Sequence, residues 1–277
     1  MEFKFFSRNG VILPVDQAQV PLSFVEYSYG FGVYETIRYS KGVLYFLKDH
    51  AQRLMESARI IELEHEFSAA FVERSVLELV ERTQSEACNL KILLIGGPTA
   101  ASAQLFILCL NPLFPDRKLY RDGASVICVE LERTFPHAKT LNMMGSYLAY
   151  RKARKAGAYD ALLVNTQGNI TEGTRTNFFC IRGKTIYSPP ESDILLGVTR
   201  KAMTIAALND GYELVARKIR QEDLGEFDGA FVTSTSSKIV PIRSVGDHVL
   251  NDQPPEMLSR LMDIFGKFLA DSKGVLE

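Results

Sequence analysis

A lysine and a glutamate in the middle of the chain have the residue types and the local settings that amine chemistry requires. Lys139 follows a predicted strand, residues 124–132, and precedes a predicted helix, residues 143–155. A side chain at such a corner is exposed on a rigid support, from which an amine can reach a carbonyl group. Glu172 follows a polar turn that ends at Asn169, and its carboxylate could pair with a ring nitrogen of a bound cofactor. Taken alone, a lysine and a glutamate in a chain with many of both are usually surface charges.

Three further stretches contain groups that bind phosphate. Residues 195–200, LLGVTR, lead directly into a helix, whose free N–H groups and dipole attract an anion, and the Thr199 hydroxyl adds a donor. Residues 231–241 end a strand in a hydroxyl-rich turn, and Arg53 on a predicted helix supplies a cation. Separately, the turn is typical of an ordinary loop and the arginine of a solvated helix face. Neither would by itself be assigned to a phosphate.

Tyr34 and Arg38 are candidates for recognising a substrate carboxylate. They lie on a predicted strand, residues 33–39, and their spacing places both side chains on one face. An aromatic hydroxyl and a guanidinium on one face suit a carboxylate. The alternative is structural, with Arg38 in an ion pair and Tyr34 packed in a core. Tyr29 is a further candidate for the same pocket.

The elements that would position these residues follow from hydrophobic spacing and from turn residues. Asn9-Gly10 is a strong hairpin signal, and Gly42 marks a second hairpin. In the first part of the chain, strands are predicted at 3–6, 11–13, 33–39, 43–47, 91–95 and 105–110. In the second part they are predicted at 124–132, 160–164, 178–181, 185–187, 213–217 and 229–233. Amphipathic helices are predicted at 48–61, 71–82, 143–155, 199–209 and 255–269.

The best predicted linker is the polar run of residues 116–122, which follows Pro112 and Pro115. It divides the chain into a smaller N-terminal α/β domain, residues 1–115, and a larger cofactor-binding domain, residues 123–277. In the larger domain the strands are short and closely spaced, with few intervening helices. This pattern predicts the α+β class with a barrel-like sheet, not a doubly wound sheet.

The composition excludes several classes of protein. The chain has 277 residues, a hydrophobic fraction of 46% and a formal net charge of −1, so a nucleic-acid partner is not expected. The four cysteines have no metal-ligand spacing and are expected to be free, buried thiols, and no metal site is predicted. No apolar run reaches the length of a membrane span and no signal-peptide layout is present, so we expect a cytoplasmic protein with no membrane partner. His50 and His137 have no visible partner and are expected to have packing or surface roles.

Residues 137–177, with the sequence on either side, resemble the class IV pyridoxal-phosphate aminotransferases. That family includes the branched-chain aminotransferases, the D-amino-acid aminotransferases and aminodeoxychorismate lyase. The resemblance covers residues 5–243, and its motifs keep the order and spacing of the family, above all Lys139 and the stretch EGTRTNFF that runs from Glu172 past Asn177. It implies the two-domain class IV aminotransferase fold and pyridoxal 5'-phosphate as cofactor.

The resemblance also implies roles for individual residues. Lys139 matches the catalytic lysine that forms the Schiff base with the cofactor and then moves a proton. Glu172 matches the partner of the pyridinium nitrogen, while Arg53 and the turn around Thr235 match phosphate contacts. The implied cofactor-binding set is Lys139, Glu172, Arg53, Leu195, Gly197, Val198, Thr199, Ser234 and Thr235. The candidate substrate-binding set is Tyr34, Arg38, Tyr29, Thr235 and Ser236.

The substrate is less tightly specified than the family. Residues 95–103, IGGPTAASA, lack the arginine-x-histidine carboxylate trap of the D-amino-acid enzymes. After Lys139 the chain reads Thr-Leu-Asn, not the glycine-rich stretch typical of branched-chain enzymes, and Thr36 with Arg38 also resembles aminodeoxychorismate lyase.

We expect a transaminase that exchanges an amino group between an amino acid, of the branched-chain type, and a 2-oxo acid. The alternatives are aminodeoxychorismate lyase, which releases pyruvate by β-elimination, a D-amino-acid aminotransferase and a non-catalytic binding protein. The resemblance also implies a homodimer.

Overall fold

The computed structural model describes residues 3–20, 23–112 and 115–276 and divides into two compact units. Unit 1 comprises Met1–Leu113, His137–Asn142 and Ser272–Glu277, and unit 2 comprises Phe114–Pro136 and Met143–Asp271. The predicted division placed Lys139 in the larger domain, whereas its short segment belongs to unit 1. The reason is backbone pairing, because Thr140 forms a β-bridge with Val33 of unit 1.

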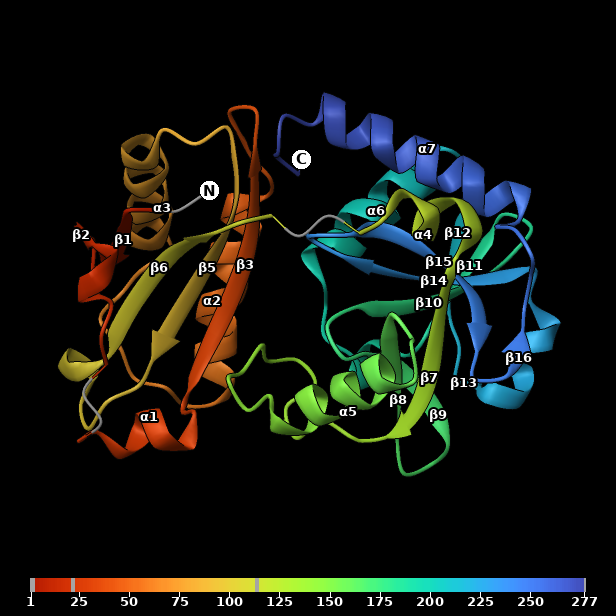
Figure 1. Ribbon diagram of the computed structural model, residues 1–277, viewed down its shortest axis with the longest axis horizontal. Coiled ribbons are helices and arrows are strands. Elements are labelled where there is room, and N and C mark those ends of the chain that lie inside the picture. The colour runs from red at the N-terminus through yellow and green to blue at the C-terminus, as the bar shows by residue number, and fades with distance from the viewer. Residues whose placement is uncertain (1–2, 21–22, 113–114, 277) are drawn as a thin grey trace. The chain divides into compact units, whose positions relative to one another are not determined.

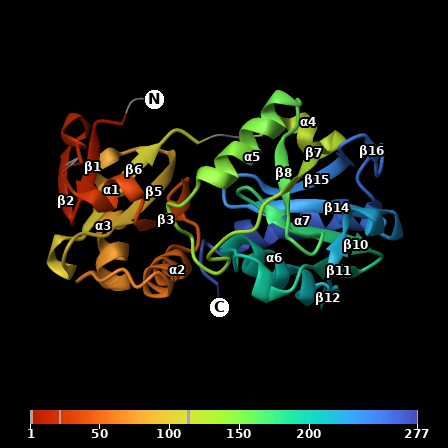
Figure 2. The same ribbon diagram turned by 90° about the horizontal axis from the view of Figure 1, so that it is seen from below.

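Unit 1 is an antiparallel sheet with two helices on one face (Figures 1 and 2). The strands run in the order β2-β1-β6-β5-β3-β4, and α2 and α3 lie side by side against them. The elements are β1 (Phe5–Arg8), β2 (Val11–Pro14), α1 (Val25–Tyr29), β3 (Gly32–Ser40), β4 (Val43–Leu44), α2 (Leu47–Ile60), α3 (Ala69–Thr83), β5 (Ala87–Ile95) and β6 (Gln104–Leu110). Their apolar core contains Val33, Ile37, Leu54, Val76, Leu90 and Ile92.

Local sequence signals account for much of this unit. Asn9 and Gly10 have φ values of 52° and 80°, the left-handed conformation that a two-residue hairpin between β1 and β2 needs. Lys41 and Gly42 repeat the arrangement between β3 and β4, with φ values of 52° and 80°. Both predicted hairpins are therefore confirmed. Alternation along β3 turns Val33, Glu35 and Ile37 away from the face that carries Tyr34 and Arg38.

Unit 2 is built on a barrel (Figure 1). Its sheet runs in the order β12-β11-β10-β14-β15-β7-β8-β9-β13, and an additional pairing of β10 with β9 closes a ring. The strands are β7 (Ala124–Glu130), β8 (Asp160–Val164), β9 (Asn169–Gly173), β10 (Asn177–Arg182), β11 (Thr185–Ser188), β12 (Glu213–Ala216), β13 (Ile219–Arg220), β14 (Gly229–Ser234), β15 (Lys238–Val245) and β16 (His248–Val249). Small and branched side chains fill the interior, among them Ala124, Val126, Ile170 and Val232. The predicted barrel-like sheet is confirmed.

Helices cover the outside of the barrel. Ala149 and Ala153 of α5 (Met144–Lys155) pack against Leu163 of β8. Helix α6 (Val198–Asn209) lies beside the closing helix α7 (Glu256–Asp271), as Figures 1 and 2 show.

Three features of unit 2 differ from the sequence-based expectations. The polar run predicted as a linker is helix α4 (Arg117–Asp122), because Asp116 caps it by accepting from the Lys118 N–H at 2.9 Å. Tyr120 ties this helix to the barrel by donating to the Ser237 carbonyl at 3.0 Å. The hydroxyl-rich turn is only Thr235–Ser237 within a hairpin, since strand β15 follows at once. Strand β9, which carries Glu172, was not predicted as a strand.

The structure also bears on two expectations from the composition, those on the cysteines and on membrane spans. The cysteines are free, with Cys88, Cys109 and Cys180 buried and Cys128 half-buried. Among the helices of the described residues, none is both long and apolar enough to cross a membrane.

Candidate active site

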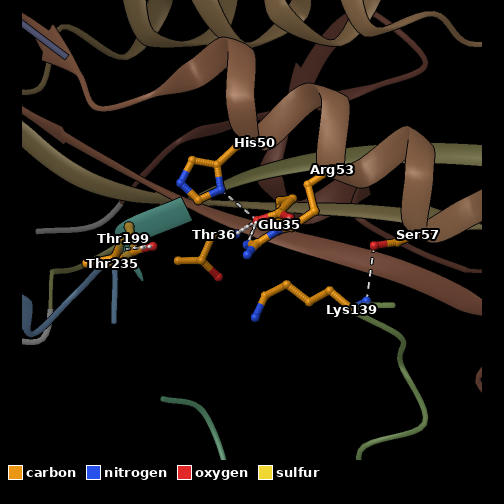
Figure 3. Close-up of polar contacts among 8 residues, drawn as sticks. All are labelled: Glu35, Thr36, His50, Arg53, Ser57, Lys139, Thr199 and Thr235. Atoms are coloured by element: carbon orange, nitrogen blue, oxygen red, sulfur yellow. Dashed lines mark hydrogen bonds and ion pairs between the residues drawn. The ribbon is translucent and has the colours of Figure 1, made fainter. Parts of the chain in front are cut away.

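Lys139 is held by the backbone of unit 1. Its N–H donates to Ser57 Oγ at 3.1 Å, and its carbonyl accepts from the Tyr34 N–H at 2.9 Å. The Leu141 N–H donates to the Gly32 carbonyl at 2.8 Å, so the segment lies along the start of β3. Figure 3 shows the Lys139 backbone at Ser57 of α2, with the side chain extending away from it. The backbone of Lys139 is thus fixed by bonds that do not involve the side-chain amine.

The ring of Tyr34 is flanked by two amines. Lys139 Nζ lies 4.6 Å from the ring centroid, and Lys91 Nζ lies 3.5 Å from it. Burial and the nearby charge of Lys139 lower the pKa of Lys91 to about 8. Sequence reasoning missed Lys91. The sequence signal that could have revealed it is a lysine inside the apolar strand NLKILLI. In the structure Lys91 lies opposite Thr36 on the neighbouring strand, so its side chain is on the same face as Tyr34.

The other substrate candidates of unit 1 have different neighbours. The guanidinium of Arg38 lies over the Tyr45 ring at 5.6 Å, so the arginine stacks on an aromatic face. Tyr29 at the end of α1 is 80% exposed. Tyr34 and Arg38 both lie on β3 with their side chains on the same face, as predicted. That they bind a substrate stays a prediction.

Arg53 takes part in a buried polar network that the sequence did not reveal. Its Nε and Nη2 donate to the two carboxylate oxygens of Glu35 at 2.6 and 2.8 Å. Nδ1 of His50 lies 2.7 Å from the same carboxylate, which is 0% exposed (Figure 3). The sequence showed no partner for His50 and predicted a packing or surface role; the residue is buried, and Glu35 becomes its partner because β3 lies against α2. The network presents Arg53 as a fixed cation, not as a solvated helix residue.

The pKa values of this network follow from burial and charge. Burial raises the pKa of Glu35, but the Arg53 charge and the His50 contact outweigh it and hold the pKa well below its ordinary range. Burial lowers the pKa of His50 despite the opposing effect of Glu35, and the positive charges of Arg53 and Lys139 lower it further. The imidazole is therefore neutral and donates from Nδ1 to an ionised carboxylate.

Acid should destabilise unit 1 in two stages. The His50 pKa is depressed in the folded protein, so unfolding takes up a proton as pH falls below the ordinary value of 6.5. The Glu35 pKa is depressed as well, so its stabilisation is present above 4.5 and is lost as pH falls further. We expect Glu35→Gln to lower the free energy of unfolding by about 3–5 kcal/mol at pH 7, because it removes the buried anion that pairs with half-buried Arg53, and to flatten the acid profile.

Urea unfolding between about pH 2 and 8 measures both effects, and Glu64→Gln at an exposed site is the matched control. A Glu35→Gln protein with the wild-type stability and acid profile would contradict the assignment.

In unit 2, Glu172 is a buried and firmly held anion. Its carboxylate is on β9, and the residue is 5% exposed. Oε1 accepts from Arg133 Nη1 at 2.7 Å, and Oε2 accepts from the Leu195 N–H at 3.2 Å. Arg133 is itself anchored by donating to the carbonyls of Phe135 and Pro136. Sequence reasoning missed Arg133, because nothing local links it to a glutamate 39 residues away.

The predicted phosphate turn lies next to this anion. The Asn177 side chain donates to the Leu195 carbonyl at 2.7 Å, so Leu195 is held at both ends of its backbone. The N-cap of α6, Gly197, lies two residues later, and the first N–H groups of the helix have no acceptor within it. Thr199 Oγ1 lies 3.4 Å from Thr235 Oγ1. Figure 3 shows the two side chains next to each other, joined by a dashed line. Backbone donors and two hydroxyls thus gather at one helix terminus.

The remaining serines of the turn are bonded mainly to each other. Ser234 Oγ lies 2.6 Å from Ser237 Oγ and 3.4 Å from Ser236 Oγ. Ser234 therefore shapes the β14–β15 hairpin, whereas Thr235 points to α6. Of the predicted hydroxyls, Thr199 and Thr235 have the geometry that best fits a phosphate.

The donor set fits pyridoxal 5'-phosphate group by group. Unit 1 offers an amine on a fixed backbone, which suits the carbonyl carbon of the cofactor. Unit 2 offers a buried carboxylate for a protonated ring nitrogen and a helix N-terminus with two hydroxyls for a phosphate. The bonds that hold Lys139 use only its backbone, whereas both carboxylate oxygens of Glu172 already accept a hydrogen bond and keep further lone pairs. Each unit therefore carries groups of the kinds that such a cofactor requires.

Comparisons with known proteins agree with this chemistry. A family model described as amino-transferase class IV matches residues 32–245. A putative branched-chain-amino-acid aminotransferase of Methanocaldococcus jannaschii is 28% identical, covering 91% of this chain and 92% of the relative. A D-alanine aminotransferase of Bacillus licheniformis is 26% identical with the same coverage.

Solved structures resemble the fold throughout. The branched-chain aminotransferase of Thermoproteus uzoniensis, solved with norvaline, aligns with a TM-score of 0.88 and 26% identity, covering 99% of this chain and 97% of that one. The branched-chain amino acid aminotransferase of Thermobaculum terrenum, solved in its PLP-form, aligns with a TM-score of 0.85 and 24% identity, covering 96% and 94%.

Proposed function

Because this chain belongs to the class IV aminotransferases, which use pyridoxal 5'-phosphate, we propose that it exchanges an amino group between a branched-chain amino acid and a 2-oxo acid. One observation carries the proposal: the chain keeps both chemical partners that such a cofactor needs. Lys139 supplies an amine beside the Tyr34 ring, and Glu172 supplies a buried, ionised partner for a ring nitrogen.

The cofactor, when bound, supplies the electron sink for the charge that develops when the substrate α-carbon loses a proton. Lys139 Nζ would hold the cofactor covalently, and the same amine would take the α-proton of a bound amino acid. Glu172 keeps the ring nitrogen protonated by accepting its hydrogen bond. The start of α6, with Thr199 and Thr235, would bind the phosphate. The family resemblance implies Arg53 of unit 1 as a further phosphate contact. These roles are proposals that rest on the family and on the local geometry.

The substrate class is argued from two features. Near-full-length relatives named as branched-chain enzymes are as similar to this chain as the D-alanine enzyme is. Residues 95–103 contain no arginine or histidine that would trap the carboxylate of a D-amino acid. Tyr34 and Arg38 are proposed to face the substrate, with Tyr29, Thr235 and Ser236 as further contacts.

We also propose a cytoplasmic homodimer. The dimer rests on the family resemblance. The location agrees with cysteines that are free in the structure, since a reducing compartment keeps thiols unpaired. Sedimentation of the purified protein measures the oligomeric state directly.

The visible absorption spectrum of the purified protein tests the function. We expect an absorption band from the lysine-bound cofactor, which L-leucine converts and 2-oxoglutarate restores, while D-alanine leaves it unchanged. Conversion by D-alanine alone would assign the chain to the other named group of relatives. Pyruvate release from aminodeoxychorismate without any 2-oxo acid would favour the lyase. A protein with no band after incubation with the cofactor would refute the proposal.

A further inference from the structure

We propose that Asp160 is a positioning residue: its buried carboxylate fixes the turn that sets Glu172 beside Asn177, and through this pair it fixes the start of α6. The proposal rests on the function proposed above, because Glu172 and α6 are assigned there to the cofactor. Asp160 itself contacts neither the cofactor nor the substrate in this mechanism.

Asp160 is an unusual residue to find inside a barrel. It begins β8 and is 0% exposed, and within the described part of the chain its bonded partners include no basic side chain. Its Oδ1 accepts from the Thr174 hydroxyl and from the Ala161 N–H, and its Oδ2 accepts from the Thr176 hydroxyl at 3.1 Å. Burial raises the pKa of this carboxyl, and the bond from Thr174 opposes the rise. A buried carboxylate is costly, so its retention calls for a specific purpose.

The carboxylate clamps the turn between β9 and β10. Both threonines lie in this turn, and the Thr174 N–H also donates to the Ala161 carbonyl at 3.0 Å. The Gly173 N–H closes the turn by donating to the Thr176 carbonyl at 2.8 Å. A Cβ added to Gly173 would overlap Thr176 Oγ1 and would come within 2.8 Å of Asp160 Oδ2. The turn is therefore packed directly onto the carboxylate.

The turn between β9 and β10 positions the side chains of Glu172 and Asn177 so that both bond to the backbone of Leu195. Glu172 precedes it, Asn177 follows it, and the two residues are directly opposite each other where β9 meets β10. Glu172 accepts from the Leu195 N–H, and Asn177 donates to the Leu195 carbonyl. Leu195 lies two residues before the N-cap of α6. A continuous set of bonds therefore runs from Asp160 to the predicted phosphate site.

A carboxylate suits this purpose better than an amide. An ionised Asp160 can only accept, so both threonine hydroxyls must donate to it, and this fixes their rotamers. An asparagine would present one donor and one acceptor, and one threonine would have to reverse its role. Asp160→Asn therefore preserves the side-chain volume and most of the hydrogen bonds, but it should let Glu172 and Leu195 move more freely.

Asp160→Asn in the full-length protein is the test, measured by amide hydrogen exchange of the cofactor-free form. We expect exchange at residues 195–199 to accelerate roughly tenfold, with the rest of the barrel unchanged and a similar Tm. With the cofactor, we expect its Kd to rise roughly tenfold and the pH titration of the visible band to shift. Asp247→Asn, at an exposed site of the same unit, should change none of these.

A second pair of variants guards against misfolding. Thr174→Val removes one clamping hydroxyl and should reproduce the faster local exchange, whereas Thr174→Ser keeps the hydroxyl and should restore the wild-type rate. Wild-type exchange at residues 195–199 in both Asp160→Asn and Thr174→Val, or acceleration spread evenly over the barrel, would overturn the proposal. Local acceleration in a protein that never binds pyridoxal phosphate would support the clamp and refute the proposed function instead.

Discussion

Lys139→Ala is expected to abolish transamination, lowering kcat by at least about a thousandfold, while the protein stays folded. The loss is large because one amine supplies both the covalent link to the cofactor and the proton transfer. The fold should survive because the bonds of Lys139 to Ser57 and Tyr34 use only its backbone N–H and carbonyl. Single-turnover assays with L-leucine measure the first effect, and circular dichroism with the Tm measures the second.

Two lysines make this experiment specific. Lys152→Ala, at an exposed site on α5, controls for the loss of a positive charge and should keep the wild-type rate. Lys91 is the other amine beside the Tyr34 ring. If Lys139→Ala kept the visible band and Lys91→Ala lost it, the cofactor would be bound covalently by Lys91 and not by Lys139. A normal steady-state rate in Lys139→Ala would contradict the mechanism altogether.

The parts of the fold that follow from sequence are those set by local interactions. The hairpin at Asn9-Gly10 and the amphipathic helix α2 depend on residues within a few positions of each other, and both were predicted. The first strand of unit 2 and the helix after Lys139 were also placed within two residues of their observed bounds. Local turn chemistry and periodicity are enough for such elements.

The parts that do not follow from sequence depend on distant pairing. Strand β9 is short and polar, and it is a strand only because the barrel supplies β8, β13 and β10 as neighbours. In the same way, Glu35 reads as one polar residue in an alternating strand until α2 brings His50 and Arg53 against it. Family resemblance pointed to Lys139 and Glu172 as site residues, but the groups that hold them, Ser57 and Arg133, lie 82 and 39 residues away. No short pattern encodes such contacts.

Glu172→Gln should lower kcat by roughly a hundredfold and shift the visible band, while leaving the barrel intact. The amide oxygen can still accept from the Leu195 N–H, so the shape of the site is kept. It carries no charge, however, and cannot keep a ring nitrogen protonated at neutral pH. Arg133 loses its ion-pair partner, so we also expect the free energy of unfolding to fall by about 1–3 kcal/mol. Glu213→Gln, at an exposed site on β12, is the matched control.

Combining this change with Arg133→Met separates charge from stability. Removing both members of an ion pair costs less than removing one, because no uncompensated charge is left in a partly buried place. The double variant should therefore recover stability relative to Glu172→Gln, as measured by urea unfolding. It should not recover kcat, since the anion for the ring nitrogen is still missing. If kcat returned together with stability, the effect of Glu172 would be structural, and its assignment as the partner of the cofactor would fail.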